Sequence, residues 1–285
     1  MSKLKIAIQK QGRLSEKSLK LLADCGIKIS NGDRKLKAEA KNFPVEILFL
    51  RDDDIPQYVE QGVAHIGFLG ENEVWEQQKN VSVLEKLGFA HCKLSLAIPK
   101  DEIYTNLNYF ENKKIATAYP KILRTFFQKN NIDVAIEEIG GSVEIAPGIG
   151  LADAVFDIVS TGSTLLMNGL KEVEVVAQSE AVLIANTNLD ENTKKTLNSL
   201  IFRIKAVKNA SENKYILLNA PASGIDEIVK ILPGMKSPTI LPLADKNWCS
   251  LHSVVKEDEF WSIIDQLKTL GAQGILVVPI EKMIV

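Results

Sequence analysis

The chain has 285 residues, of which 46% are apolar and 25% charged, and its net charge at pH 7 is −2. This is the balance of an ordinary globular protein with about two domains, and a third small domain is possible. The sequence lacks the basic excess typical of nucleic-acid or membrane-surface binding, and no apolar run reaches the roughly 18 residues of a transmembrane helix. We therefore expect no nucleic-acid partner and no membrane.

Cysteine and histidine are few and scattered. The three cysteines are odd in number, which is typical of a reducing compartment rather than of a disulfide framework. The three histidines show no zinc-ligand spacing. The N-terminus lacks the long apolar region of a signal peptide. The composition predicts a cytoplasmic protein without a built-in transition metal.

Strand-like and helix-like runs alternate from the N-terminus. Residues 3–8 predict a strand, and residues 14–26 predict a helix with Ser15 as its N-cap and Gly26 at its end. Further strands are predicted at 45–50 and 65–69, with a helix at 52–62 between them. This alternation indicates a largely parallel sheet covered by helices.

Two segments 92 residues apart share one layout. Residues 64–76 and 156–168 each contain an apolar strand, a glycine (Gly70 or Gly162) and a helix-like continuation. Strand-like segments at 93–99 and 181–186 would cross between two similar lobes. Ligands of open α/β sheets lie outside the carboxyl ends of the strands, so the two repeated loops would face one cleft.

The pattern changes after Lys208. The order strand, helix, strand, strand, helix, strand over about 70 residues is that of a ferredoxin-like unit. The predicted elements are residues 214–221, 224–234, 238–244, 248–255, 256–272 and 274–280. We expect this unit to pack as a separate domain without catalytic residues.

The loop from Ser160 to Thr164 reads "STGST" and follows an apolar run. Small side chains let backbone N–H groups surround an anion, and hydroxyls add further donors. The alternative is an ordinary turn in which Thr161 or Ser163 caps the next helix. Alone, the loop favours this plainer alternative.

Charged residues accompany this loop in the sequence. Glu144 and Asp157 could point into one cleft, where carboxylates would accept hydrogen bonds from ribose hydroxyls. Lys10 and Arg13 flank Gly12 directly after the first strand, and Arg51 follows the second, where cations can meet a polyphosphate. Each could equally be an ordinary surface or capping residue.

Together these residues resemble the ATP phosphoribosyltransferases, the first enzymes of histidine biosynthesis. The family signature runs from Glu144 and Gly150 through Asp157 to Thr161–Leu165 without a mismatch. Other segments extend the resemblance to the long form over essentially the whole chain: "AIQKQGRLS", "LRDDDIP", "GENE", "MNGLKEVEVV", "SPTILPLA" and "PIEKM".

The resemblance implies an enzyme that attaches ribose C1 of 5-phosphoribosyl-1-pyrophosphate to adenine N1 of ATP and releases pyrophosphate with Mg²⁺. Ser160, Thr161, Gly162, Ser163 and Thr164 would hold the 5-phosphate. Glu144 and Asp157 would hold the ribose and steady its developing positive charge, and Mg²⁺ could lie near them, although no metal ligands are assigned. The ATP side would comprise Lys10, Gly12, Arg13, Arg51 and Glu71, with Lys10 and Arg13 also serving catalysis.

The C-terminal unit resembles the regulatory domain at which histidine inhibits the long-form enzymes. The matching positions are Asn219, Met235, Thr239 and Gly274. Asn219 departs from relatives that carry an acid there, which leaves the affinity for histidine open. The resemblance also implies a homo-oligomer, from dimer to hexamer.

The predicted fold is thus α/β, with a two-lobed periplasmic-binding-protein-like catalytic region and a C-terminal ferredoxin-like (ACT-like) regulatory domain. Lobe I comprises residues 1–93 and 181–208, lobe II residues 94–180, and the regulatory domain residues 209–285. The alternatives are a two-lobed small-molecule-binding protein without catalysis, a catalytic-only subunit of a split enzyme, and a phosphoribosyltransferase for another base.

Overall fold

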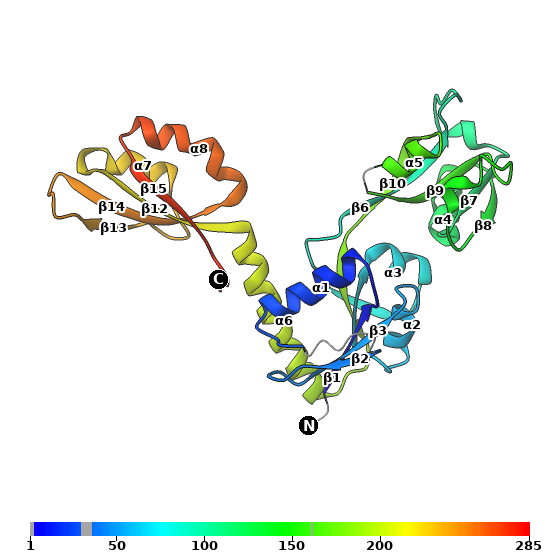
Figure 1. Cartoon of the computed structure of the whole chain (residues 1–285), viewed down its shortest axis with the longest axis horizontal. Helices are drawn as coiled ribbons and strands as arrows, with labels where there is room; N and C mark the ends of the chain where they lie inside the picture. Colours follow the sequence, from blue (N-terminus) through cyan, green and yellow to red (C-terminus); the bar gives the residue numbers. More distant parts are fainter. Residues whose placement is uncertain (1–2, 30–35, 161) are drawn as a thin grey trace. The chain divides into compact units, whose positions relative to one another are not determined.

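The computed structural model describes residues 3–29, 36–160 and 162–285, which form two compact units (Figure 1). The first unit comprises Met1–Lys20 and Ile27–Thr196, and the second comprises Leu21–Gly26 and Leu197–Val285. The first unit contains two sheets, and the second contains one.

The N-terminal sheet of the first unit has six strands. Their order across the sheet is β2 (Lys37–Glu39), β3 (Val45–Leu50), β1 (Leu4–Gln9), β4 (Ile66–Gly70), β11 (Ala181–Asn186) and β5 (Val81–Lys86). The central strand β1 is parallel to β3 and β4, as the alternation predicts, whereas β11 runs antiparallel to β4. The helix α2 (Ile55–Glu60) packs on this sheet through buried Ile55 and Val59.

The other sheet of this unit has five strands. Their order is β10 (Leu170–Ser179), β6 (Cys92–Pro99), β9 (Ala154–Val159), β7 (Lys114–Thr117) and β8 (Ala135–Glu138). The associated helices are α4 (Pro120–Asn130), α5 (Ser163–Met167) and the short 3-10 helices η1 (Leu107–Phe110) and η2 (Val143–Ile145). Buried Phe110, Phe127 and Phe156 form the centre of its core.

Two connections join these sheets, as the sequence predicts. The chain passes from β5 to β6 and returns from β10 to β11. The repeated layout is also confirmed, because β4 is followed by α3 (Glu71–Gln77) and β9 by α5, with Gly70 and Gly162 as the two N-cap residues. The repeat therefore places two equivalent strand-to-helix turns in one unit.

The predicted N-cap Ser15 is wrong. The helix α1 (Arg13–Asp24) begins two residues earlier, and Ser15 is buried inside its first turn. Gly12 adopts a φ of 97°, which turns the chain so sharply that its carbonyl already accepts the N–H of Glu16 at 3.1 Å. The glycine therefore starts the helix before the first serine.

Ser18 of α1 is fully buried, and its hydroxyl has no hydrogen-bond partner among the described residues. An unsatisfied buried hydroxyl costs about 1–3 kcal/mol, and alanine is the better helix former. We expect Ser18→Ala to raise the free energy of unfolding, measured by urea denaturation, by about 1 kcal/mol. The control is Ser179→Ala, which removes a buried hydroxyl bonded to Asn72 and should lower stability. A loss of stability in Ser18→Ala would contradict the expectation.

The second unit contains the predicted ferredoxin-like order. Its elements are β12 (Asn213–Pro221), the short 3-10 helix η3 (Ala222–Gly224), α7 (Ile225–Ile231), β13 (Thr239–Pro242), β14 (Trp248–Lys256), α8 (Glu257–Thr269) and β15 (Gln273–Pro279). The sheet order is β13-β14-β12-β15, and all neighbours are antiparallel. The fold class is confirmed.

The long helix α6 (Glu191–Glu212) precedes this sheet without a break. Its C-terminal part belongs to the second unit together with the end of α1, where Arg203 Nη1 donates to the carbonyl of Cys25 at 3.1 Å. The predicted start of the C-terminal domain, residue 209, lies within this helix. A continuous helix carries no composition change that would mark the division.

Candidate functional site

The two repeated turns meet at one cavity of about 420 Å³, which we call the site cavity. Gly70 contributes from the turn after β4, and Ser160 from the turn after β9. Its lining residues are Arg13, Leu14, Lys17, Asp52, Gly70, Asn72, Glu73, Ala90, His91, Cys92, Ile158 and Ser160. The sequence-based prediction that these turns face a shared cleft is therefore confirmed.

A second cavity of about 400 Å³ shares His91, Cys92 and Ser160 with the site cavity. Its other lining residues include the cations Lys86 and Lys93 and the acids Glu71 and Glu180. Ser160 therefore lies where a larger polar ligand could extend from one cavity into the other.

The predicted anion loop lies at the carboxyl end of β9. Ser160 is exposed, and Gly162 has a φ of 76°, a left-handed conformation that a side chain would strain. Ser163 and Thr164 form the first turn of α5. Thr161 lies outside the described residues. Because Gly162 is the N-cap residue, the helix does not begin with Ser163 as its cap, contrary to the plainer alternative for that residue.

Asp157, on β9, is close enough to Glu144 for the two carboxylates to interact. Burial raises the pKa of Asp157 to about 6, and the nearby charge of Glu144 adds to the rise, while the Ile158 N–H donates to its carboxylate at 2.7 Å. Glu144 reaches this position from η2. The charge of Glu144 thus acts on Asp157, but neither carboxylate is among the residues that line the two cavities.

A third acid, Glu73, was not predicted from the sequence. It lines the site cavity and is 6% exposed, and burial, followed by the charge of Asp52, raises its pKa to about 7. Tyr119 donates a hydrogen bond to this carboxylate, and the pKa of the phenol is raised by burial and then by Glu73, Asp157 and Asp52. Acids from both sheets therefore approach one phenol.

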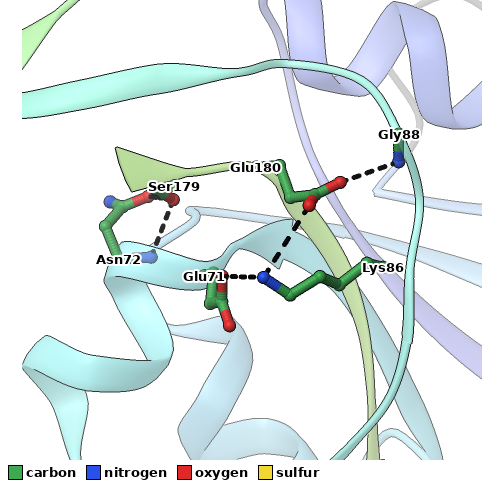
Figure 2. A network of polar contacts seen from close by, with 6 residues as sticks. All are labelled: Glu71, Asn72, Lys86, Gly88, Ser179 and Glu180. Carbon is green, nitrogen blue, oxygen red and sulfur yellow. Dashed lines mark hydrogen bonds and ion pairs between the residues drawn. The ribbon is translucent and has the colours of Figure 1, made fainter. Parts of the chain in front are cut away.

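Glu71 faces another way, although it lies in the same "GENE" segment. Residues two apart on an α-helix point about 200° apart, so Glu71 and Glu73 cannot face one cavity side by side. Figure 2 shows Glu71 paired with Lys86 at 3.1 Å, and Lys86 approaching Glu180 at 3.8 Å. Glu71 and Lys86 both line the second cavity, so a ligand there would meet this ion pair.

The same network ties the two connections between the sheets. Glu180 accepts the N–H of Gly88 at 3.0 Å, and Ser179 exchanges hydrogen bonds of 3.0 and 2.9 Å with Asn72 (Figure 2). Asn72 in turn donates to Glu73 at 2.9 Å. A continuous chain of polar contacts therefore links the crossing strands to the acid in the site cavity.

The predicted cations differ in placement. Arg13 lines the site cavity from the first residue of α1, and Gly12 and Lys10 are exposed in the turn before it. Arg51 makes two hydrogen bonds to Asp53, at 3.2 and 3.1 Å. Arg51 is therefore held by a neighbour in sequence and is not among the residues lining either cavity.

Of the predicted regulatory residues, Asn219 on β12 and Gly274 on β15 lie on neighbouring strands, whereas Thr239 lies on β13, beyond β14. Asn219 Nδ2 would be 3.7 Å from a Cβ placed on Gly274, so these two positions are adjacent. Thr239 pairs with His252, while Asn219 pairs with Ser250. Met235, in the turn after α7, is 53% exposed.

His252 itself was missed by the sequence analysis. Tyr215 lies 2.8 Å from its Nδ1, and Ser250 lies 3.2 Å from its Nε2 and donates to the Leu218 carbonyl. With the Ser250 proton used in this way, the ring is assigned as donating from Nε2 and accepting from Tyr215 at Nδ1. Side chains alternate between the two faces of a sheet along β12 and β14, and this period could have placed Tyr215, Ser250 and His252 on the same face from the sequence.

The described part of the chain contains neither a membrane-spanning helix nor a metal-binding cluster. No helix there is both long and apolar enough to cross a membrane. Across residues 3–29, 36–160 and 162–285, no three His, Cys, Asp or Glu side chains gather in a way that could hold a metal ion.

Comparisons with known proteins agree over the whole chain. A family model described as "ATP phosphoribosyltransferase" matches residues 51–206, and one described as "HisG, C-terminal domain" matches residues 210–282. An ATP phosphoribosyltransferase of Bacteroides thetaiotaomicron is 57% identical over 282 residues, which are 99% of this chain and 100% of the relative. One of Azobacteroides pseudotrichonymphae is 59% identical over 281 residues, 99% of each chain.

A solved structure is also similar. The "ATP phosphoribosyl transferase (HisG:HisZ) complex from Thermotoga maritima" contains a chain that matches with a TM-score of 0.62 and 27% identity. The match covers 71% of this chain and 96% of that chain.

Proposed function

Because this chain belongs to the ATP phosphoribosyltransferase family, we propose that it joins adenine N1 of ATP to ribose C1 of 5-phosphoribosyl-1-pyrophosphate and releases pyrophosphate. Family membership makes it a pentosyltransferase of histidine biosynthesis. The observation that carries the finer proposal is the site cavity, where Ser160 of the hydroxyl-rich turn after β9 lies with the cation Arg13 and the acids Asp52 and Glu73.

The proposal assigns the phosphoribosyl group to the turn from Ser160 to Thr164. Backbone N–H groups and hydroxyls there would hold the 5-phosphate, since Gly162 permits a tight turn at the carboxyl end of β9. Arg13 and Lys10 would face the ATP phosphates or the leaving pyrophosphate. Arg51 would join them after leaving Asp53, and Glu71 would approach the nucleotide after leaving Lys86.

Glu144 and Asp157 would hold the ribose hydroxyls and stabilise the positive charge that develops at C1 as pyrophosphate departs. The attacking atom is a ring nitrogen of ATP, so the enzyme needs no nucleophile of its own. Positioning and charge stabilisation would supply most of the rate enhancement. No general base is assigned.

The two carboxylates also suit Mg²⁺. This ion is commonly bound through one or two carboxylates while substrate phosphates and waters complete its shell. The charge of Glu144 acts on Asp157, so an ion that arrives with the pyrophosphate group would relieve the repulsion between the two carboxylates. When bound there, Mg²⁺ would neutralise charge on the leaving group.

We further propose that histidine inhibits this enzyme at the second unit, through Asn219, Met235, Thr239 and Gly274, and that the chain forms a homo-oligomer. The adjacency of Asn219 and Gly274 supports a shared site. Inhibition would couple this site to the catalytic one.

The identity of residue 219 gives a direct test of the histidine site. Replacing Asn219 by Asp provides a carboxylate that can accept a hydrogen bond from the amino group of histidine. Such a charge-assisted hydrogen bond is stronger than the neutral one that asparagine can make. We expect Asn219→Asp to lower the half-inhibitory histidine concentration about 10-fold. The control is Asn247→Asp, which adds the same charge at an exposed position before β14. An unchanged or higher half-inhibitory concentration would count against the site.

The function itself is tested by mixing the protein with ATP, 5-phosphoribosyl-1-pyrophosphate, Mg²⁺ and pyrophosphatase, and following the absorbance of the N1-substituted adenine. Product suppressed by histidine is the expected result. Product insensitive to histidine would remove the regulatory proposal alone. No product from folded protein would favour a two-lobed binding protein without catalysis.

A further inference from the structure

The helix α3 starts on one sheet of the first unit and contacts the other. It follows β4 of the six-stranded sheet directly, with Gly70 as its N-cap residue. Near its other end, Trp75 packs against the core cluster of the five-stranded sheet, which is centred on Phe110, Phe127 and Phe156. This short helix therefore joins the two sheets beside the site cavity.

Glu76 of α3 makes the most specific of these contacts. Its carboxylate accepts the Lys121 N–H at 3.1 and 3.2 Å, one distance for each oxygen, and the Ile122 N–H at 3.1 Å. Both donors belong to the first turn of α4, which lies beside the five-stranded sheet. Glu76 is 5% exposed, so these charge-assisted bonds form away from water.

The helix α4 has no side-chain cap of its own. Its N-cap residue is Tyr119, whose side chain makes no capping hydrogen bond, and Pro120 follows in the first helical turn. A helix N-terminus leaves several N–H groups without partners and carries a partial positive charge. The Glu76 carboxylate satisfies two of these groups from a different helix.

This contact also determines where Tyr119 lies. Glu73 is one turn before Glu76 on α3, so both acids point to the same side of the helix. Glu76 holds the backbone just after Tyr119, while Glu73 accepts a hydrogen bond from the Tyr119 phenol and lines the site cavity. Glu76 is not among the residues that line the cavity.

We propose that Glu76 is a positioning residue that fastens α4 to α3, and thereby keeps the two sheets and Tyr119 arranged around the site cavity as substrates bind. This inference rests on the proposed function only for its kinetic consequence. Without the contact, only a fraction of the protein molecules would have the arrangement that binds substrate. The apparent affinity for substrate is reduced in proportion to that fraction. A bound substrate still restores the arrangement, so kcat changes little.

The kinetic test compares Glu76→Ala with Glu76→Gln, which keeps the shape and one acceptor oxygen. We expect Glu76→Ala to raise KM for ATP and for 5-phosphoribosyl-1-pyrophosphate about 10-fold each, with kcat within about 3-fold of wild type. Glu76→Gln should recover most of the loss. The matched control is Asp153→Ala, which removes a carboxylate that accepts the Lys114 N–H at 2.8 Å next to the five-stranded sheet. Both KM values should stay unchanged in the control.

A spectroscopic readout is independent of activity. The chain has three tryptophans, so Trp248→Phe and Trp261→Phe leave Trp75 as the sole reporter of this contact. In that background Glu76→Ala should shift Trp75 emission to the red and increase its quenching by acrylamide, whereas Asp153→Ala should do neither. If Glu76→Ala does not fold, a smaller red shift in Glu76→Gln carries the test.

Unchanged Trp75 emission in folded Glu76 variants would overturn the proposal, and so would wild-type KM values in Glu76→Ala. An inactive wild-type protein would instead remove the proposed function, and the Trp75 emission would still decide whether Glu76 holds the sheets together.

Discussion

Replacing Asp157 by Asn is expected to lower kcat/KM by at least about 100-fold, because the ionised carboxylate would stabilise the charge that develops on the ribose. The side chain lies on β9 just before the anion loop and near Glu144. Asparagine keeps the size and can still accept the Ile158 N–H, but it carries no charge. The loss should fall mainly on kcat, unlike the loss in Glu76→Ala.

The pH dependence separates this role from a structural one. The pKa of Asp157 is raised to about 6 by burial and by Glu144, so wild-type kcat/KM should rise as the pH passes through that value. The step should be missing from Asp157→Asn. Asp153→Asn, four residues earlier at an exposed position, serves as the control and should keep both rate and profile. A folded Asp157→Asn protein with activity within about 3-fold of wild type would refute the assignment.

Glu73 is expected to make the protein less stable as the pH rises. Its pKa is about 7 in the folded protein, above the value of 4.5 for a free glutamate, so the folded state binds the proton more tightly than the unfolded state. Stability from this group is fully present below pH 4.5 and is lost as the pH rises through 7. A shift of this size corresponds to about 3 kcal/mol.

Urea unfolding at pH 5 and pH 8 measures this effect. Wild type should lose more stability between these values than Glu73→Gln, because the amide cannot ionise in the buried site. The exposed acid Glu138 of β8 provides the control, since Glu138→Gln removes one negative charge and should keep the wild-type dependence. An equal pH dependence of the unfolding free energy in wild type and Glu73→Gln would show that folding does not raise the pKa of Glu73.

Most elements of the fold could be predicted from the sequence, because local patterns specify them. The apolar runs at 45–50 and 181–186 are β3 and β11 with the predicted bounds. The helix start at Ser15 was wrong because Gly12 turns the chain before any capping side chain is reached. The predicted start of the C-terminal domain, residue 209, stays a prediction, since it lies within the continuous helix α6.

The site was predictable where one segment carries several of its groups. The turn after β9 and the acid Asp157 lie within a few residues, and their spacing matches the family signature. Glu73 was missed although it lies in the noted segment 64–76, and Tyr119 was missed because no pattern was noted in its part of the chain. Glu71 was chosen from "GENE" and stays a prediction; α3 directs this side chain to Lys86 and the second cavity, and brings Glu73 to the site cavity.

The sequence by itself determined many of the strands and helices, the paired strand-to-helix turns and the family, because these depend on side-chain periodicity and short-range spacing. It did not predict β7, α4, β8 or β10. The tertiary structure alone decided which charges meet. Arg51 pairs with Asp53, Asp157 lies near Glu144, and Glu76 reaches the first turn of α4. Partners such as Glu76 and Ile122 are 46 residues apart in the chain, so no local pattern encodes their contact. Only the packing of two sheets, driven by burial of their apolar cores, brings such groups within hydrogen-bond distance.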